Sequence, residues 1–237
     1  MKLDILEKTA LSYPRHVFPW HVHPDYHCIS LVTAGQAILE IPNQQMVILP
    51  GDLLFVPAGL PHRTVVERSF SYKIIRFRRE QGEGLLSFRR TADADVVNSF
   101  QSWFGQQHGI EQTNGVFLTE FLSSESPVNT LRKDDAIARC LEFMHHHFAE
   151  GLSLDDLSKV ALRSSSHLLR TFRTQVGISP ARYIMGLKID NAKALIQTGH
   201  TLVDTALSTG FYDQSHFTRH FKKLAGLSPR AYQSLIR

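Results

Sequence analysis

The stretch from Ser215 to Tyr232, SHFTRHFKKLAGLSPRAY, has a counterpart 49 residues earlier in the same chain. Ser166 to Tyr183 reads SHLLRTFRTQVGISPARY, and eight of the eighteen positions are identical without a gap. A repeat at a fixed spacing indicates that one structural unit occurs twice. The C-terminal part of the chain is therefore expected to contain two copies of the same local fold.

Each copy predicts an amphipathic helix that ends at a glycine. Apolar side chains recur at i, i+4 and i+7 or i+8 and form one stripe: Phe217, Phe221 and Leu224 in the second copy, Leu168, Phe172 and Val176 in the first. Gly226 and Gly177 suit the left-handed conformation that often ends a helix. A Ser-Pro pair follows each glycine after one residue, and it predicts the start of another helix, with Ser as the cap and Pro in the first turn.

A shorter helix and a tight turn precede each of these amphipathic helices. Ser153 and Thr201 are suitable N-caps for the shorter helices, and Asp follows each of them in the first turn. Together the elements form a helix-turn-helix pattern, whose second helix can enter the major groove of DNA. The side chains expected to face DNA are Ser166, Arg170 and Arg173 in the first unit and Gln214, Thr218, Arg219 and Lys222 in the second. A pair of amphipathic hairpins with solvated faces is the alternative, and the duplication favours DNA binding.

The segment GFYDQSHFTRHFKKLAGLSPRAY, Gly210 to Tyr232, resembles the signature of AraC/XylS-type transcription regulators. The resemblance covers about Asp134 to Arg237. It implies seven helices in two helix-turn-helix units on one connecting helix, from about Pro180 to Gln197. One side of that connector would carry Ile184, Leu187, Ala194 and Leu195. The sequence departs from the family pattern at Lys188, where Arg is frequent, at Ser158, where Ala is usual, and at Leu169, which falls on the expected DNA face.

Composition and charge fit a two-domain DNA-binding protein. At 237 residues and 43% apolar content the chain can hold two modest domains, and it contains no apolar run long enough for a membrane span. The N-terminus lacks the apolar core of a secretion signal, and the two cysteines form no Cys-x-x-Cys pair. Residues 1–131 hold 11 Lys and Arg against 13 Asp and Glu, whereas residues 132–237 hold 15 against 9. We therefore expect a cytoplasmic protein whose C-terminal half is attracted to phosphates.

The N-terminal part predicts a small antiparallel β-barrel or sandwich. Short β-prone runs alternate with turn residues at Cys28–Val32, Ala37–Ile41, Met46–Leu49, Leu53–Val56, His62–Val66 and Tyr72–Phe77, after a lead-in strand within residues 1–17. The fold class is accordingly α+β, with domains at 1–80, 81–130 and 131–237.

Two histidine-containing segments resemble the cupin motifs. The first is His21-x-His23 followed by His27 and Gly35, and the second runs from Gly51 to His62. Many AraC-type regulators carry such a barrel as an effector-binding and dimerising domain. His21, His23, His27 and His62 match cupin metal-ligand positions, although cupins frequently have Glu at the position of His27. Imidazole suits divalent transition metals such as Zn, Ni or Co. Alternatively, these histidines hydrogen-bond an organic effector or line its pocket.

Residues 80–130 predict helices at Leu85–Arg90, Asp95–Phe104 and Val116–Leu122, followed by a linker at Ser123–Asn129. These helices either form a homodimer surface or cover an open face of the barrel.

The sequence thus predicts a regulator that binds promoter DNA and senses a small molecule or a divalent metal, with RNA polymerase as a partner if it activates. Arg170 and Arg219 are expected to read bases, because Arg bonds guanine with two hydrogen bonds. Arg173 and Lys222 are expected to contact phosphates. A cupin-type metalloenzyme with a helical appendage is the alternative. No acid/base carboxylate accompanies the histidines, so we expect no enzymatic activity and no required cofactor.

Overall fold

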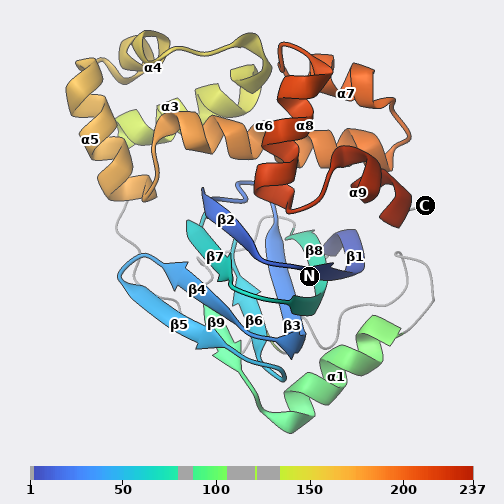
Figure 1. The fold of residues 1–237 in the computed structure, drawn as a ribbon. Coiled ribbons are helices and arrows are strands. Elements are labelled where there is room, and N and C mark those ends of the chain that lie inside the picture. Colours follow the sequence, from blue (N-terminus) through green and yellow to red (C-terminus); the bar gives the residue numbers. More distant parts are fainter. Residues whose placement is uncertain (1–2, 80–87, 106–120, 122–133, 237) are drawn as a thin grey trace.

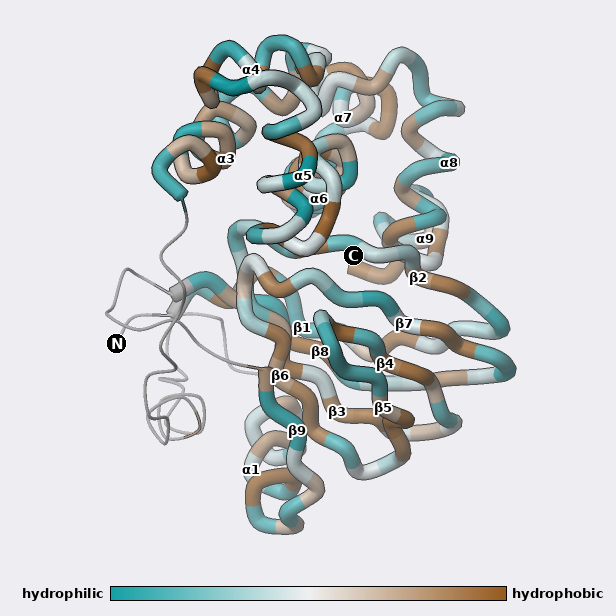
Figure 2. The backbone as a smooth tube through the Cα atoms, turned by 90° about the vertical axis from the view of Figure 1, so that its left-hand side faces the viewer, coloured by the Kyte–Doolittle hydropathy of each residue, from teal (hydrophilic) through white to brown (hydrophobic). Residues whose placement is uncertain are grey.

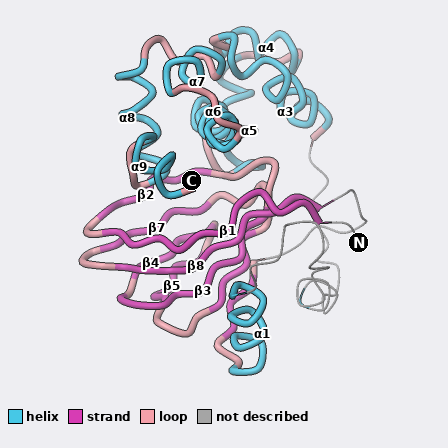
Figure 3. The backbone as a smooth tube through the Cα atoms, turned by 90° about the vertical axis from the view of Figure 1, so that its right-hand side faces the viewer, coloured by secondary structure: helices cyan, strands magenta, loops and turns pink. Residues whose placement is uncertain are grey.

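The computed structural model describes residues 3–79, 88–105, 121 and 134–236. A layer of strands lies below a layer of helices, and of the labelled helices only α1 lies on the strand side (Figures 1 and 3). This arrangement confirms the predicted α+β class, with a β domain followed by a helical domain. None of the helices in the described part of the chain has the length and apolar character needed to cross a bilayer.

The β domain consists of two antiparallel sheets that face each other. One has the strand order β1-β8-β3-β6-β9 and the other has the order β2-β7-β4-β5. The strands are β1 Leu3–Tyr13, β2 His16–His21, β3 His27–Gly35, β4 Ala37–Ile41, β5 Gln44–Ile48, β6 Leu53–Val56, β7 His62–Val66, β8 Phe70–Arg79 and β9 Arg89–Thr91. Every predicted β-prone run lies in one of these strands, except that Met46–Leu49 extends one residue past the end of β5.

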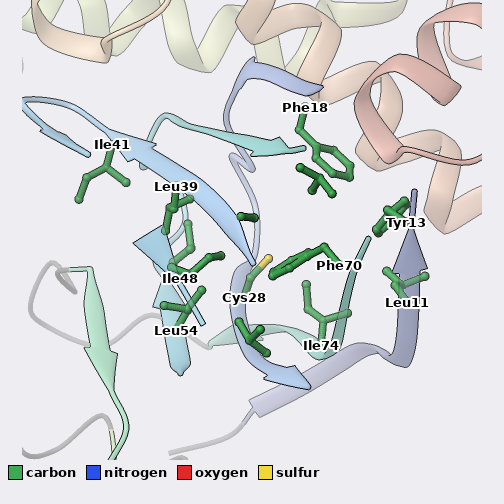
Figure 4. Packing of buried hydrophobic residues seen from close by; sticks show 14 of the residues in the cluster. Leu11, Tyr13, Phe18, Cys28, Leu39, Ile41, Ile48, Leu54, Phe70 and Ile74 are labelled. Atoms are coloured by element: carbon green, nitrogen blue, oxygen red, sulfur yellow. The ribbon is translucent and has the colours of Figure 1, made fainter. Parts of the chain in front are cut away.

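Side-chain alternation explains how the sheets form a core. Along β4, Ala37, Leu39 and Ile41 are buried while the residues between them are half-buried, as expected for a strand with one inward face. Inward residues from both sheets form one apolar cluster, part of which Figure 4 shows. β6 is buried on both faces, and it appears as an apolar strand in Figure 2.

Helix α1 (Ala94–Gly105) covers the outer face of the five-stranded sheet. Its Phe100 is fully buried among residues of β3, β6 and β8. The helix predicted at Asp95–Phe104 is confirmed, and it has the covering role. The helix predicted at Leu85–Arg90 is wrong over the described part of that range, because Arg89–Thr91 pairs with β6 as strand β9. The helix predicted at Val116–Leu122 and the linker lie outside the described residues, apart from Phe121.

The helical domain follows the duplicated sequence. Its helices are α3 Asp135–His147, α4 Leu154–Ala161, α5 Ser165–Val176, α6 Pro180–Gln197, α7 Leu202–Ser208, α8 Gln214–Ala225 and α9 Pro229–Leu235, with a short 3₁₀ turn at Phe148–Glu150. Ser153 and Thr201 cap α4 and α7. Gly177 and Gly226 end α5 and α8 in the left-handed conformation. The pattern of caps in the sequence therefore predicted the helix boundaries correctly.

The connecting helix α6 has the predicted bounds but not the predicted one-sided stripe. Leu187 packs in the core of the first helix-turn-helix unit, whereas Ala192 and Ile196 pack in the core of the second. Ala194 is exposed. The prediction of a single apolar stripe was wrong because α6 contacts both helix-turn-helix units and the β domain. Its apolar residues are therefore distributed around its circumference.

Candidate functional site

Helices α5 and α8 present the residues that the sequence assigned to DNA. Ser166, Arg170 and Arg173 on α5 are exposed. On α8, Gln214, Arg219 and Lys222 are exposed and Thr218 is half-buried. The opposite faces carry the fully buried Leu168, Phe172, Phe217 and Phe221. Within the described residues, none of the four cationic side chains on these faces forms an ion pair. Each helix therefore offers a polar and basic face to solvent.

Lys188 supports the second unit from inside the domain. Its Nζ donates a 2.6 Å hydrogen bond to the carbonyl of Gly210 and lies over the ring of Phe211. Both partners belong to the turn between α7 and α8. Sequence reasoning noted Lys188 only as a departure from the family pattern. Its structural role could not be found there, because the partner carbonyl lies 22 residues away.

A cavity of about 100 Å³ lies between the two sheets, on the side of the β domain that faces the helices. Tyr13 and Phe18 lie on that side (Figure 4). The apolar part of the lining comes from both sheets: Phe18, Cys28, Val32, Leu39, Ile48, Leu54, Val56, Phe70 and Ile74. The polar lining includes His21, His23, His62 and Arg76. This is the space in which an effector of the barrel would bind.

The helical domain completes the wall of this cavity. Lys193 of α6 and Leu224 and Ala225 of α8 are lining residues. The hydroxyl of Tyr13 donates a 3.0 Å hydrogen bond to the carbonyl of Ala225. A molecule in the cavity would therefore contact both domains.

Buried charged groups join the domains beside the cavity. Glu7 and Arg76 of the β domain form an ion pair, and the hydroxyl of Tyr232 donates a 2.8 Å hydrogen bond to Glu7. Burial alone would raise the pKa of Glu7, but the positive charges of Arg76 and Lys193 and the hydrogen bonds from Arg76 and Tyr232 together lower it. Lys193 is only 7% exposed, and burial lowers its pKa. Sequence reasoning found none of these residues, because they are spread over the chain.

Three of the four predicted histidines come together. One ligand nitrogen each from His21, His23 and His62 lies within 4.8 Å of the others. His27 lies apart from them. Its Nδ1 accepts a 3.0 Å hydrogen bond from the backbone of Ala58, and its ring stacks on Phe55. The four-residue site that the sequence predicted is therefore a three-residue cluster in the structure.

Hydrogen bonds determine which nitrogen each clustered histidine can offer. Nδ1 of His21 bonds the carbonyl of Pro19 at 2.7 Å, and Nδ1 of His62 bonds the carbonyl of Leu60 at 3.0 Å. A carbonyl only accepts, so both Nδ1 atoms carry the proton and both Nε2 atoms carry a lone pair. Burial, reinforced by the neighbouring rings, lowers the pKa of His21 well below its usual value and keeps the ring neutral.

His23 is held in the same tautomer by a residue of the other domain. The hydroxyl of Tyr26 donates to Asp190 of α6 at 2.8 Å, so it accepts from Nδ1 of His23, also at 2.8 Å. Burial lowers the pKa of His23 well below its usual value. Three neutral imidazoles with unprotonated Nε2 atoms thus lie together, with one ring nitrogen of each within 4.8 Å of the others.

Comparison with known proteins identifies both parts of the chain. The AraC-like ligand binding domain matches residues 6–170, and a helix-turn-helix domain matches residues 157–234. The uncharacterized HTH-type transcriptional regulator YbfI of Bacillus subtilis is 31% identical over 84% of this chain and 81% of its own length. The probable transcriptional regulator LumQ of Photobacterium leiognathi is 35% identical over 91% of this chain and 92% of its own.

The fold is also similar to that of solved structures. ToxT from Vibrio cholerae superimposes with a TM-score of 0.65 at 13% identity over 97% of both chains. Wild-type ToxT bound to an unsaturated fatty acid gives a TM-score of 0.65 at 15% identity, over 98% of this chain and 95% of that one. At these identities the similarity concerns the fold alone. The relatives are transcription regulators, so they give no support to the alternative of a cupin-type metalloenzyme.

Proposed function

The chain belongs to the AraC family of helix-turn-helix transcription regulators, and from this premise we propose that an effector in the cavity controls its sequence-specific binding to promoter DNA. The main support for this proposal is the composition of the cavity wall. Residues of the helical domain line a space within the β domain, namely Lys193, Leu224 and Ala225. A ligand there has a different set of contacts whenever the two domains move relative to each other. It can therefore shift the equilibrium between two domain arrangements.

The exposed faces of α5 and α8 are the proposed DNA contacts. In this proposal Arg170 and Arg219 read guanine together with Ser166, Gln214 and Thr218, while Arg173 and Lys222 contact phosphates. Arg219→Ala should weaken binding to the preferred site by about 1–3 kcal/mol and relax specificity at one base pair. Lys222→Ala should weaken binding to all sequences and reduce the salt dependence by about one phosphate contact. Equal losses for Arg219→Ala on every sequence would assign Arg219 to the backbone.

We propose a small organic anion as the effector. The cavity of about 100 Å³ has room for more than one water-sized group, because a single water needs roughly 10–15 Å³. Its walls combine apolar and polar side chains, and Nε of Arg76 is a buried donor without a hydrogen-bond partner among the described groups. A carboxylate could accept from Arg76 and approach Lys193, while its body occupies the apolar part. The fatty acid bound to ToxT, which has a similar fold, supports this class of ligand.

Thermal unfolding with a series of carboxylates and their matched amides tests this proposal. Carboxylates should raise the unfolding temperature and amides should not, and Lys193→Met should reduce the effect. Equal effects of the two series would show that charge has no part in recognition.

A divalent transition metal is the second candidate effector, because three neutral imidazoles with an unprotonated nitrogen lie close together. The acceptors that hold each Nδ1–H in place, two backbone carbonyls and the hydroxyl of Tyr26, are the outer partners usual for histidine metal ligands. His21, His23 and His62 would supply three nitrogen ligands and leave positions for oxygen ligands. Asp190, behind Tyr26 and His23, would link the ion to α6.

Cobalt loading separates the metal proposal from the anion proposal. Purified protein treated with chelator and then with Co²⁺ should retain about one ion per chain, with a visible absorption band. His21→Ala combined with His23→Ala should abolish retention, and His27→Gln should not, because His27 lies outside the cluster. A stoichiometry near zero, or an equal loss in His27→Gln, would remove the metal from consideration.

We also propose that the regulator acts in the cytoplasm as a homodimer, with RNA polymerase as its partner if it activates. Dimers bind two DNA sites related by symmetry and gain affinity from both. Light scattering after size-exclusion chromatography should give twice the mass of 26.9 kDa for one chain. A mass of one chain, both free and on DNA, would contradict the dimer.

A further inference from the structure

We propose that the last turn of α8 is part of the effector site, so that the ligand acts directly on the second DNA-reading helix and not on the first. This inference rests on the proposed function and adds the route by which the ligand acts. It comes from a difference between the two copies of the repeat, which end in the same way but contact different parts of the β domain.

The C-terminal end of α8 packs against the wall of the cavity. Gly226 has φ of 79°, and a Cβ added there would lie 2.4 Å from Cε1 of Tyr13 and 2.9 Å from the ring of Phe18. The hydroxyl of Tyr13 bonds the carbonyl of Ala225. Tyr13, Phe18 and Ala225 all line the cavity, as does Leu224. The residues that hold α8 in place are thus the residues that an effector would touch.

The end of α5 is seated elsewhere. Gly177 has φ of 82°, and a Cβ added there would lie 2.8 Å from Cγ of Pro61. Neither Gly177 nor Pro61 is among the residues that line the cavity. Figure 1 shows both helices with their C-terminal ends toward the β domain. The β domain therefore holds both reading helices, but only one of the two contacts borders the effector.

The direction of the effect follows from packing. A ligand that fills the cavity places atoms against Leu224 and Ala225, and it buries apolar surface that water would otherwise cover. Undocking α8 would expose the ligand, so the ligand favours the docked state. Motions of the last turn of α8 should become rarer when the cavity is occupied, while those of α5 should keep their rate.

Amide hydrogen exchange of the full chain, resolved by peptide, measures these motions directly. Benzoate serves as the anionic probe and Co²⁺ as the metal probe, and calorimetry gives the Kd of each. At a probe concentration ten times the Kd, exchange in residues 222–227 should slow about elevenfold, because opening requires release of the ligand. Exchange in residues 173–178 should not change.

A cavity-filling variant makes the test independent of the choice of probe. Val32 lines the cavity from β3, and Val32→Phe should slow exchange at the end of α8 without any ligand. Val56→Leu, a smaller filling substitution, replaces it if Val32→Phe does not fold by circular dichroism. Arg219→Ala is the matched control, since it alters the exposed face of the same helix and should leave the exchange of its last turn unchanged.

Two outcomes would overturn the inference: slowing confined to α5, or an occupied or filled cavity with no slowing in α8. Failure of the proposed function is a separate result, namely wild-type protein that selects no DNA sequence. Specific DNA binding together with unchanged exchange in α8 would refute only the direct route.

Discussion

Replacing Gly226 by alanine should weaken the contact between the two domains more than an ordinary glycine replacement would. Two terms add. An alanine at φ of 79° costs about 1–2 kcal/mol, because its Cβ approaches the following carbonyl. Its Cβ would also lie 2.4 Å from the ring of Tyr13, which is 4% exposed and is held by its hydrogen bond to Ala225, and overpacking of this kind costs about 1–3 kcal/mol. Together they predict a loss of about 2–5 kcal/mol.

Gly199→Ala is the matched control. Gly199 has φ of 88°, and a Cβ added there meets no atom within 4 Å. It therefore carries the backbone cost alone, about 1–2 kcal/mol. The difference between the two variants isolates the contact between α8 and the β domain.

Urea unfolding followed by the fluorescence of Trp20 is the assay. Trp20 comes from β2 and packs against the core of the first helix-turn-helix unit, so its emission reports on the joined domains. Trp103 is the only other tryptophan, and Trp103→Phe leaves Trp20 as the sole reporter. Equal losses in Gly226→Ala and Gly199→Ala would show that the seat of α8 on Tyr13 contributes nothing, and would refute this account of the interface.

Two further predictions use the same unfolding assay, and a third is measured by DNA binding. Glu7→Gln should cost about 3–5 kcal/mol near neutral pH, since it leaves Arg76 buried without its countercharge. Because the fold lowers the pKa of Glu7, the wild-type advantage should be complete above about pH 4.3 and disappear as the pH falls through the folded-state pKa; a constant penalty down to acid pH would be contrary. Gly186→Ala should destabilise despite a helix-propensity gain of about 1 kcal/mol, because its Cβ would lie 2.8 Å from the carbonyl of Val22; net stabilisation would show that this approach is loose. Lys188→Met should leave the helix content measured by circular dichroism unchanged but weaken binding to the DNA segment that α8 reads severalfold. Unchanged DNA affinity would show that Lys188 contributes only to packing.

The helical domain could be predicted almost completely because its determinants are local. The cap, the apolar stripe and the terminal glycine that define a helix all lie within or next to that helix, and the repeat contains this set twice. The prediction of one apolar stripe on the connecting helix α6 was wrong because its burial is not determined locally. Which residues of α6 are buried depends on its contacts with two hydrophobic cores and with the β domain. Residues close to α6 in the sequence do not determine these contacts.

The candidate site could be predicted only where residues are close in sequence or carry a recognisable pattern. His21 and His23 alternate along one segment and therefore share a side, and the second motif supplied His62. His27 was included by its position in that pattern, but its ring lies against Phe55, away from the cluster. Lys193 reaches the cavity from α6, about 170 residues after His23 in the chain. No local sequence pattern connects Lys193 with the histidines.

Selection of bound sequences from a random DNA duplex pool tests the central claim most directly. The wild-type chain should enrich a site with two conserved segments about one helical turn apart, one for each reading helix. Arg170→Ala and Arg219→Ala should each remove preference from one of the two segments and leave the other intact. Absence of any enriched sequence, or the same enriched site from all three proteins, would contradict the claim that α5 and α8 read DNA.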